Sequence, residues 1–225
     1  TGNHGRGVAY AARRRGLRAV ICMSSLVPQT KIDGIRALGA EVKIVGRSQD
    51  DAMAESLRLV EHEGLVEISP FDDAHVIAGQ GTIGLELIED WPEMDTVVVP
   101  LSGGGLLAGI ASAVKAKRPS ARLIGVTMER GPAMYDSLRA GKPVEVVEEP
   151  TLADSLGGGI GLDNAYTFEI TRKLIDETAL LSEAEIAAAT VLKGEGELAF
   201  NWPDSHSSLA YVEHTSEGLV HGSAG

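Results

Sequence analysis

Short apolar, often β-branched runs alternate with amphipathic stretches along the first half of the chain. The runs expected to form strands cover residues 18–23, 41–45, 65–68, 96–99 and 122–127. The helical patterns between them cover residues 8–15, 30–38, 49–63, 84–89 and 106–117. Such alternation predicts an α/β fold in which helices cover both faces of a parallel sheet. The unbroken apolar run at 97–99 is typical of a strand buried on both sides.

A break in this rhythm, Ser-Pro-Phe-Asp-Asp at residues 69–73, suggests a domain boundary. We therefore expect a small domain over residues 1–68, a large-domain portion over 69–190 and an atypical tail over 191–225. The tail has scattered Gly, Ser and His and no clear period. Before it, Ser182 and Glu185 form a capping-box pattern that predicts one more helix.

Composition narrows the class of function. The net charge of −12 disfavours nonspecific binding to nucleic acid, because both would be polyanions. Charged residues interrupt every apolar run before it reaches the roughly 18 residues that a membrane span needs. The single cysteine, Cys22, excludes an internal disulfide framework and fits a reducing, cytoplasmic location. Small-molecule chemistry or a protein partner remains.

The clearest candidate site is the segment 100–106, Pro-Leu-Ser-Gly-Gly-Gly-Leu, between an expected strand and an expected helix. Glycines let the backbone turn tightly, and the N-terminus of the helix attracts anions, so this loop predicts a phosphate cradle. A turn kept only for close packing is the alternative. The pattern Gly103-x-Gly105-x-x-Ala108, followed by Glu129, also satisfies the dinucleotide fingerprint, which leaves a nicotinamide enzyme open.

The segment 1–7, Thr-Gly-Asn-His-Gly-Arg-Gly, is interpreted as a second glycine-rich loop that leads into a helix. Its amides are suited to another anion, such as a substrate carboxylate, and Asn3 adds an uncharged donor and acceptor. Alternatively, Asn3 only supplies a left-handed turn. Two such loops together suggest a ligand with two anionic groups. Because the chain opens inside this motif without Met, we expect that it is a fragment whose beginning lies upstream.

Several motifs give the chain a specific resemblance. Thr-Gly-Asn-His-Gly at 1–5 is similar to the Ser-x-Gly-Asn-His loop of fold-type II pyridoxal-phosphate (PLP) enzymes, the threonine/serine dehydratase and serine racemase family. Gly-Gln-Gly-Thr at 79–82 and Val-Pro-Leu-Ser-Gly-Gly-Gly-Leu at 99–106 match that family in order and spacing. Val-Pro-x-x-Lys at 27–31 and Arg-x-x-Gly-Ala-Glu-Val at 36–42 match it as well.

The resemblance covers roughly residues 1–190. It implies a three-layer, parallel-sheet fold of type II, similar to the tryptophan synthase β subunit, and incomplete in this chain. With residues 151–159, Thr-Leu-Ala-Asp-Ser-Leu-Gly-Gly-Gly, the opening motif most resembles the threonine dehydratase-like enzymes linked to hydroxyectoine breakdown. The implied activity is conversion of a β-hydroxy amino acid, threonine- or serine-like, into a 2-oxo acid and ammonia. The family also implies a homo-oligomer.

Site roles follow from the resemblance residue by residue. Asn3 is expected to hydrogen-bond the ring hydroxyl oxygen of the cofactor. Thr1 and His4, with Asn3, are expected to hold the substrate carboxylate. Thr1 stands where serine racemase has a proton-donating serine, but its extra methyl argues against racemase activity. The cofactor phosphate is expected to bind backbone amides of Ser102, Gly103, Gly104, Gly105 and Leu106.

The family's Schiff-base lysine, in a Ser-Phe-Lys segment before the Asn loop, has no counterpart in this sequence. Lys31 is the nearest substitute, but it and the other lysines read as solvated charges. We therefore expect no catalytic residue here other than Thr1, and no turnover from this chain alone. Ser223 is a candidate stand-in for the family's hydroxyl residue that faces the pyridine nitrogen. No metal ligand is assigned.

Three other functions stay open at this stage. A β-replacement synthase shares the fold, although its Asn is commonly followed by Thr rather than by His4. A nicotinamide oxidoreductase explains the loop at 100–106 but leaves the loop at 1–7 without a role. A degenerate, nonenzymatic binding module agrees with the missing lysine.

Overall fold

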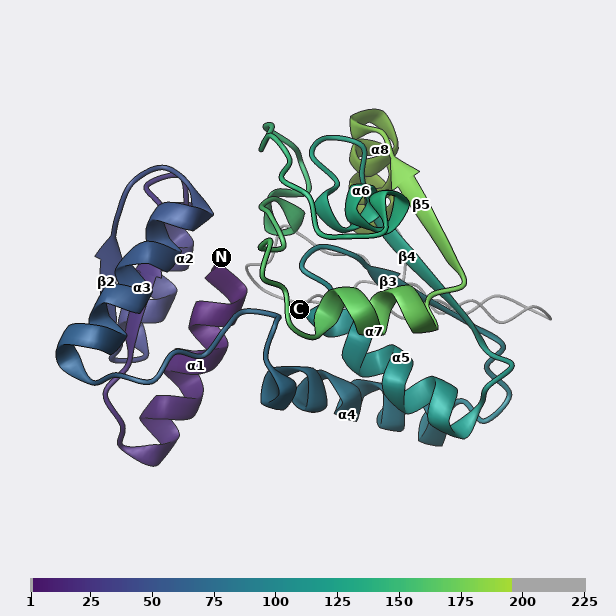
Figure 1. Cartoon of the computed structure of the whole chain (residues 1–225), viewed down its shortest axis with the longest axis horizontal. Coiled ribbons are helices and arrows are strands. Elements are labelled where there is room, and N and C mark those ends of the chain that lie inside the picture. The colour runs from purple at the N-terminus through teal and green to yellow at the C-terminus, as the bar shows by residue number, and fades with distance from the viewer. Residues whose placement is uncertain (1, 196–225) are drawn as a thin grey trace. The chain divides into compact units, whose positions relative to one another are not determined.

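The computed structural model describes residues 2–195 and divides the chain into two compact units, Thr1–Pro70 and Phe71–Gly225 (Figure 1). The division falls inside the Ser-Pro-Phe-Asp-Asp segment at 69–73. Each unit has its own parallel sheet and its own apolar core. Within the described residues, no helix combines the length and the apolar character that crossing a membrane requires.

Unit 1 is a two-stranded parallel sheet with three helices. In chain order its elements are α1 (Gly2–Arg15), β1 (Val20–Met23), α2 (Gln29–Ala37), β2 (Glu41–Ile44) and α3 (Gln49–Glu63). Strand β1 pairs with β2 in a register that places Val20 opposite Glu41. Helix α3 begins at a capping box formed by Ser48 and Asp51 and ends at the left-handed Gly64.

The two faces of this sheet are covered differently. Ile21 and Met23 of β1 form the apolar core of unit 1 with residues of α1 and α2, chiefly Ala9, Ile32 and Ile35. Successive strand residues point to opposite faces, so the alternate residues of β1 face the other side, which α3 contacts. The result is a three-layer arrangement of two helices, a sheet and one helix.

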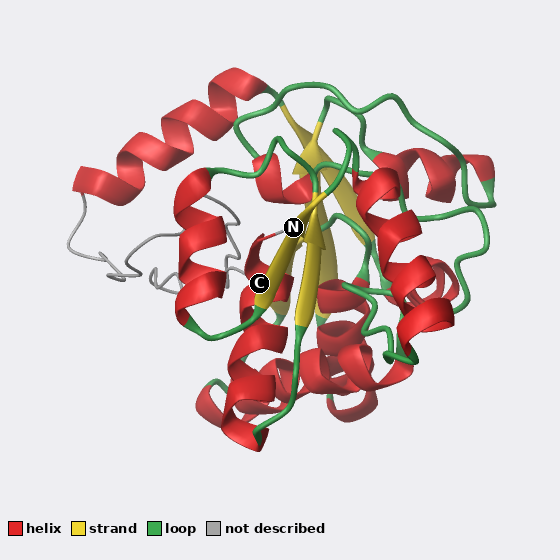
Figure 2. Ribbon diagram, turned by 90° about the vertical axis from the view of Figure 1, so that its left-hand side faces the viewer, coloured by secondary structure: helices red, strands yellow, loops and turns green. Residues whose placement is uncertain are grey.

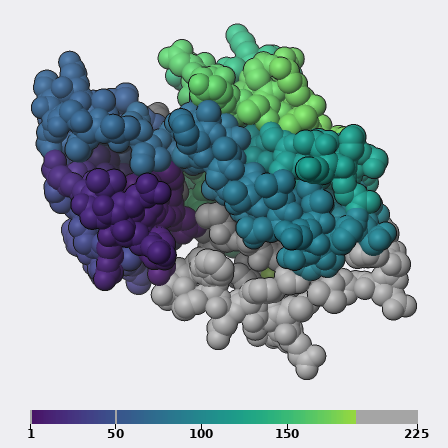
Figure 3. Space-filling view, turned by 90° about the horizontal axis from the view of Figure 1, so that it is seen from below, coloured from purple at the N-terminus to yellow at the C-terminus, as the bar shows by residue number. Residues whose placement is uncertain are grey.

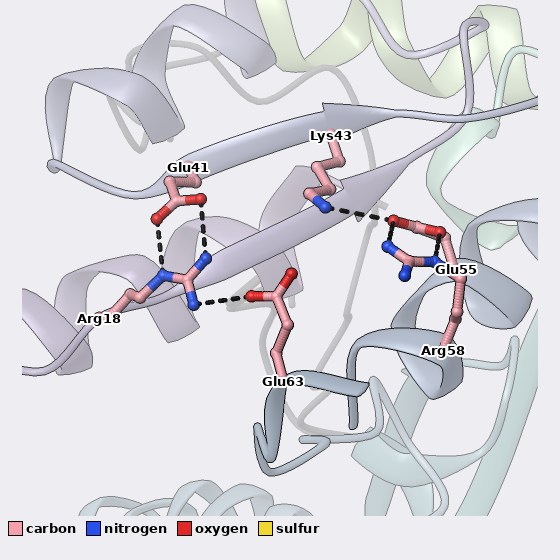
Figure 4. Close-up of polar contacts among 6 residues, drawn as sticks. All are labelled: Arg18, Glu41, Lys43, Glu55, Arg58 and Glu63. Carbon is pink, nitrogen blue, oxygen red and sulfur yellow. Dashed lines mark hydrogen bonds and ion pairs between the residues drawn. The ribbon is translucent and has the colours of Figure 1, made fainter. Parts of the chain in front are cut away.

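Ion pairs join α3 to the edge of the sheet (Figure 4). Arg18 contacts both Glu41 and Glu63, with N–O distances of 2.7 and 2.9 Å. A second group joins Lys43 of β2 to Glu55 of α3 at 3.3 Å, and Glu55 also contacts Arg58. The pairs of Arg18 are partly exposed to solvent, which weakens them, whereas Glu55 is only 16% exposed, and both groups mainly fix the orientation of α3.

Figure 2 shows the strands in yellow and the helices in red. Within its described residues, unit 2 contains a three-stranded parallel sheet in the order β3-β4-β5. Thr96 pairs with Arg122, and Ile124 with Glu177. In chain order the elements are α4 (Ala74–Asp90), β3 (Thr96–Pro100), α5 (Gly105–Lys117), β4 (Arg122–Met128), α6 (Ala133–Ala140), the 3-10 turn η1 (Asp154–Leu156), α7 (Thr167–Leu174), β5 (Glu177–Leu181) and α8 (Glu183–Glu195).

Helices α4 and α5 touch through their main chains. A Cβ added at Gly84 would lie 2.8 Å from the Ile110 carbonyl oxygen, and one at Gly109 would lie 2.7 Å from the Gly81 nitrogen. Only glycine fits at such distances, so the Gly-Gln-Gly-Thr motif at 79–82 belongs to a helix contact. Part of α4 lies at the surface (blue to teal in Figure 3). The Leu85 side chain of this helix is half exposed.

Most of the expected helices and strands are present, and the bounds of several agree closely with the prediction. The predicted strands at 41–45, 96–99 and 122–127 correspond to β2, β3 and β4, and the predicted helix at 49–63 is α3. The capping box of Ser182 and Glu185 is confirmed: the Ser182 amide donates to Glu185 at 2.8 Å and α8 follows. The α/β, parallel-sheet prediction is therefore confirmed.

Two predictions of local structure are wrong, and a third gives a helix that is too short. Residues 1–7 were expected to form a loop, but α1 already begins at Gly2. Residues 65–68 form no strand in the described part of the chain, because no neighbouring strand pairs with them and Val66 stays 87% exposed. The helix expected at 84–89 is only the end of α4, whose start is set by Asp73 accepting from the amides of His75 and Val76.

Candidate cofactor-phosphate site

The loop at 100–105 links the buried end of β3 to the first turn of α5. The Leu101 amide still donates to the Val126 carbonyl at 2.7 Å, which continues the β3–β4 ladder. The chain then turns through Gly104, whose φ of 89° lies in the left-handed region, and α5 begins at Gly105. Its N-cap residue, Gly104, has no side chain, and none of the described side chains accepts a hydrogen bond from the first amides of α5. The first amides of a helix have no acceptor within the helix, so this loop presents uncapped donors at a positive helix end.

Each of the three loop glycines has a separate steric reason. A Cβ at Gly103 would collide with the Phe71 ring, and one at Gly105 would lie 2.8 Å from the Phe71 Cα. A Cβ at Gly104 would lie 2.7 Å from Met134 Cε and 3.2 Å from Thr167 Cβ, on a backbone that already favours glycine. Close packing, the alternative considered above, therefore accounts for Gly103 and Gly105. It coexists with the anion-binding geometry rather than replacing it.

Ser102 anchors the same loop through its side chain. The Ser102 hydroxyl donates to the Leu156 carbonyl in η1 at 2.9 Å. Because this hydroxyl has one proton, it has none left to donate to an anion. Any contribution of Ser102 to phosphate binding therefore comes from its backbone amide, as the family resemblance implies.

At the start of unit 1, Asn3 and His4 lie in the first turn of α1 and are partly buried. The His4 Nε2 lies 2.8 Å from the Ile68 carbonyl oxygen, which can only accept, so Nε2 carries the proton. Burial is the main influence on His4 and lowers its pKa from 6.5, against an opposing effect of the Ile68 hydrogen bond. A neutral His4 of this tautomer has only an acceptor left at Nδ1, which does not suit a carboxylate.

Helix packing accounts for two glycines of the α1 segment that was interpreted as a loop, Gly2 and Gly5. A Cβ at Gly2 would lie 2.5 Å from Lys31 Cδ, and one at Gly5 would lie 2.6 Å from Ile21 Cγ2. Gly7 has open space. The first amides of α1 still point out of the helix end, so an anion remains a suitable ligand there. Thr1, the third expected carboxylate ligand, lies outside the described residues, as does Ser223.

The described lysines have structural or solvent contacts. Lys43 pairs with Glu55 and Lys115 with Asp176, at 3.3 and 2.7 Å. Lys31 packs its side chain over Gly2. The three lysines at 117, 142 and 173 are exposed. Within residues 2–195, no group of three or more His, Cys, Asp or Glu side chains has the arrangement of a metal site.

Sequence reasoning missed the two residues next to the loop, Phe71 and Asp72. The segment at 69–73 was interpreted only as a break between domains. In the structure Phe71 packs against the glycines of the loop. Asp72 accepts hydrogen bonds from three successive amides at the start of α7, those of Ala165, Tyr166 and Thr167. The only sequence signal was two adjacent acidic residues in front of a helix, of which Asp73 caps α4.

The uncapped amides, the left-handed Gly104 and the absence of room for side chains fit the phosphate group of a cofactor such as PLP. The same features at a dinucleotide loop would look alike, so the geometry defines the anion and not the remainder of the ligand. Comparison with known proteins distinguishes the two.

The pyridoxal-phosphate-dependent enzyme family model matches residues 1–222. A Sinorhizobium fredii protein, provisionally named a threonine dehydratase, is 61% identical over 84% of this chain and 57% of its own length. The L-threonine ammonia-lyase of Thermotoga maritima is 45% identical over 84% of this chain and 46% of its own. The solved structure of maize serine racemase superposes with a TM-score of 0.80 at 34% identity, covering 86% of this chain and 58% of that one.

The chain thus spans about half the length of the relatives that it matches. The family match agrees with the phosphate-binding geometry of the loop and with the parallel α/β architecture of both units. This chain belongs to the family of pyridoxal-phosphate-dependent enzymes.

Proposed function

We propose that the chain supplies the cofactor-phosphate site of a PLP-dependent ammonia-lyase that converts a threonine- or serine-like amino acid into a 2-oxo acid and ammonia. The observation that carries the proposal is the uncapped N-terminus of α5 behind the left-handed Gly104. The curated relatives include L-threonine ammonia-lyases and biosynthetic threonine dehydratases. We infer a cytoplasmic homo-oligomer for the complete enzyme.

In this proposal the backbone amides of residues 102–106 bind the phosphate. The partial positive charge of the α5 N-terminus stabilises the phosphate dianion without a charged side chain. Ser102, held by its bond to Leu156, fixes the entry of the loop. PLP, when bound, supplies an electron-withdrawing ring that stabilises negative charge at the substrate α-carbon.

The first turn of α1 is proposed to take the substrate carboxylate. Its amides and the Asn3 side chain are the donors available for this, with Thr1 as a further donor. Asn3 is proposed to hydrogen-bond the ring hydroxyl oxygen as well. His4 has a different role in our view: its bond to Ile68 holds the segment that follows α3 against the start of α1.

Proton transfer at the substrate requires a base, and we propose that the lysine of the family is not among the residues of this chain. Lys43 and Lys115 are engaged with carboxylates, which supports that view. The chain is accordingly proposed to bind PLP without turnover, and threonine or serine added with PLP should yield no 2-oxo acid.

Equilibrium dialysis with PLP, with inorganic phosphate as competitor, tests the proposal. We expect PLP binding that phosphate displaces, no binding of NADH, and no single lysine labelled after borohydride reduction and mass spectrometry. NADH binding without PLP binding would support the oxidoreductase alternative. A stoichiometric borohydride-stabilised adduct at one lysine would overturn the proposed absence of the Schiff-base lysine.

A further inference from the structure

We propose that Phe71 and Asp72 are positioning residues that hold the loop at 102–105 in its phosphate-binding conformation. This inference rests on the proposed function, because it concerns the same loop. Both residues belong to unit 2 and stand directly at its start. Neither belongs to the glycine-rich motif, and they act on it from two sides.

Phe71 forms one side. Its ring occupies the space that a side chain at Gly103 would need, and its backbone lies where a Cβ at Gly105 would be, 2.8 Å from Phe71 Cα and 2.9 Å from its carbonyl oxygen. The loop therefore lies in direct contact with residue 71 before and after the left-handed Gly104. Because packed interiors leave little free space, displacement of Phe71 allows the loop to relax.

Asp72 controls the other side through α7. One of its carboxylate oxygens accepts from the Ala165 amide at 2.6 Å, and the other accepts from the amides of Tyr166 and Thr167 at 2.9 and 2.8 Å. The helix that they begin, α7, then contacts Gly104: Thr167 Cβ and Thr171 Oγ1 each lie 3.2 Å from the position of a Cβ there. Both threonines are completely buried.

The two helix starts in unit 2 are thus treated differently. At α7 the Asp72 carboxylate already accepts a hydrogen bond from the Thr167 amide. The Asn164 side chain accepts another from the Phe168 amide at 2.8 Å. At α5 the N-cap is a glycine, and among residues 2–195 no side chain accepts from the first helical amides. An anion attracted to this part of unit 2 consequently finds donors at α5, while α7 is held firmly enough to support the loop.

A pair of ligands that differ only by phosphate tests the role of Asp72. Pyridoxine 5′-phosphate and pyridoxine have no aldehyde, so they do not react with lysines. We expect Asp72→Ala to lower the preference of the chain for the phosphorylated ligand about fivefold, the size of one lost helix cap. Asp72→Asn, which retains one acceptor oxygen, should restore part of this preference.

Asp73→Ala is the matched control, because Asp73 caps α4 and accepts hydrogen bonds from two backbone amides. Both alanine variants should lose a similar amount of thermal stability, but only Asp72→Ala should change the ligand preference. An unchanged preference in Asp72→Ala, or an equal change in Asp73→Ala, would overturn the inference. If the unmodified chain itself does not prefer the phosphorylated ligand, the proposed function fails and this inference with it.

A double-mutant cycle tests Phe71 independently of any ligand. Gly103→Ala should lower the melting temperature in the natural background and much less in a Phe71→Ala background, because the colliding ring is gone. Gly105→Ala should be equally harmful in both backgrounds, since it collides with the main chain of residue 71. Additive effects of Gly103→Ala and Phe71→Ala would show that Phe71 does not set the position of the loop.

Discussion

The chain begins two helices with similar glycine-rich segments, at α1 in unit 1 and at α5 in unit 2, and the glycines have different functions in each. In α1 they lie inside the helix, where Gly2 and Gly5 let other side chains approach. In front of α5 they form a true turn, with Gly104 at φ 89° as a helix N-cap that has no side chain. Similar composition therefore yields close helix packing in one unit and a turn that leaves the first amides of a helix uncapped in the other.

The largest expected effect comes from Gly104→Ala. The left-handed backbone costs about 1–2 kcal/mol for a residue with a Cβ, and overpacking against Met134 and Thr167 adds to this, so we expect a loss of about 3 kcal/mol. Urea unfolding gives the free energy. Gly141→Ala, also left-handed at φ 72° but with open space around it, isolates the backbone cost. Equal losses in the two variants would mean that no collision occurs at Gly104.

The next effect distinguishes the glycines of α1. Gly5→Ala should cost about 1 kcal/mol net, because the collision with Ile21 outweighs the gain in helix propensity. Gly7→Ala meets no atom within 4 Å and should instead stabilise the chain by about 1 kcal/mol. Thermal unfolding of both variants measures the difference. We predict that the two substitutions change the stability in opposite directions. Stabilisation by Gly5→Ala would contradict the role of Gly5 in helix packing.

A smaller effect is expected from Thr171→Val beside Gly104. The Thr171 hydroxyl is buried and has no hydrogen-bond partner among the described residues. Valine has nearly the same shape and removes this unsatisfied group, so stability should rise by up to about 1 kcal/mol. Phosphate binding should not change. A loss of stability on urea unfolding would reveal a partner for the hydroxyl.

Lowering the pH tests whether neutral His4 in α1 contributes to stability. The pKa of His4 is lowered in the folded chain, chiefly by burial, so the unfolded chain binds the proton more tightly. Stability contributed by neutral His4 is present above pH 6.5 and is lost as the pH falls from 6.5 through the folded pKa. Comparing unfolding at several pH values with the His4→Gln variant isolates this contribution. The two proteins should respond equally to pH if His4 does not titrate in this way.

The parts of the fold that the sequence predicts well are those with local signals. Strand β3 is an unbroken apolar run, and α3 and α8 carry capping boxes within four residues of chain. The edge strand β5 and helices α6 and α7 have weaker local signals, and they are defined by contacts with distant residues. Asp72 shows this most clearly, since its partners lie 93 to 95 residues further along the chain.

The candidate site divides in the same way. The loop at 102–106 is recognisable because its strand, glycines and helix are consecutive in sequence. The hydrogen bond between His4 and Ile68 spans 64 residues and has no local signal, whereas the substrate role expected for His4 came from the family resemblance. Thr167 and Met134, which pack against Gly104, have no feature in the sequence that marks them as site residues. Only the structure shows that they lie next to the loop.

The glycine contact between α4 and α5 has a consequence for how the loop can evolve. Where the main chains of two helices are in direct contact, no side chain lies between them that could change rotamer to accommodate a shift. The backbone atoms themselves therefore fix the distance between the axes of α4 and α5. Any bulkier residue at Gly84 or Gly109 would push the two axes apart and carry the first turn of α5 with them. The direction in which the first amides of α5 point therefore depends partly on the face of α5 that contacts α4.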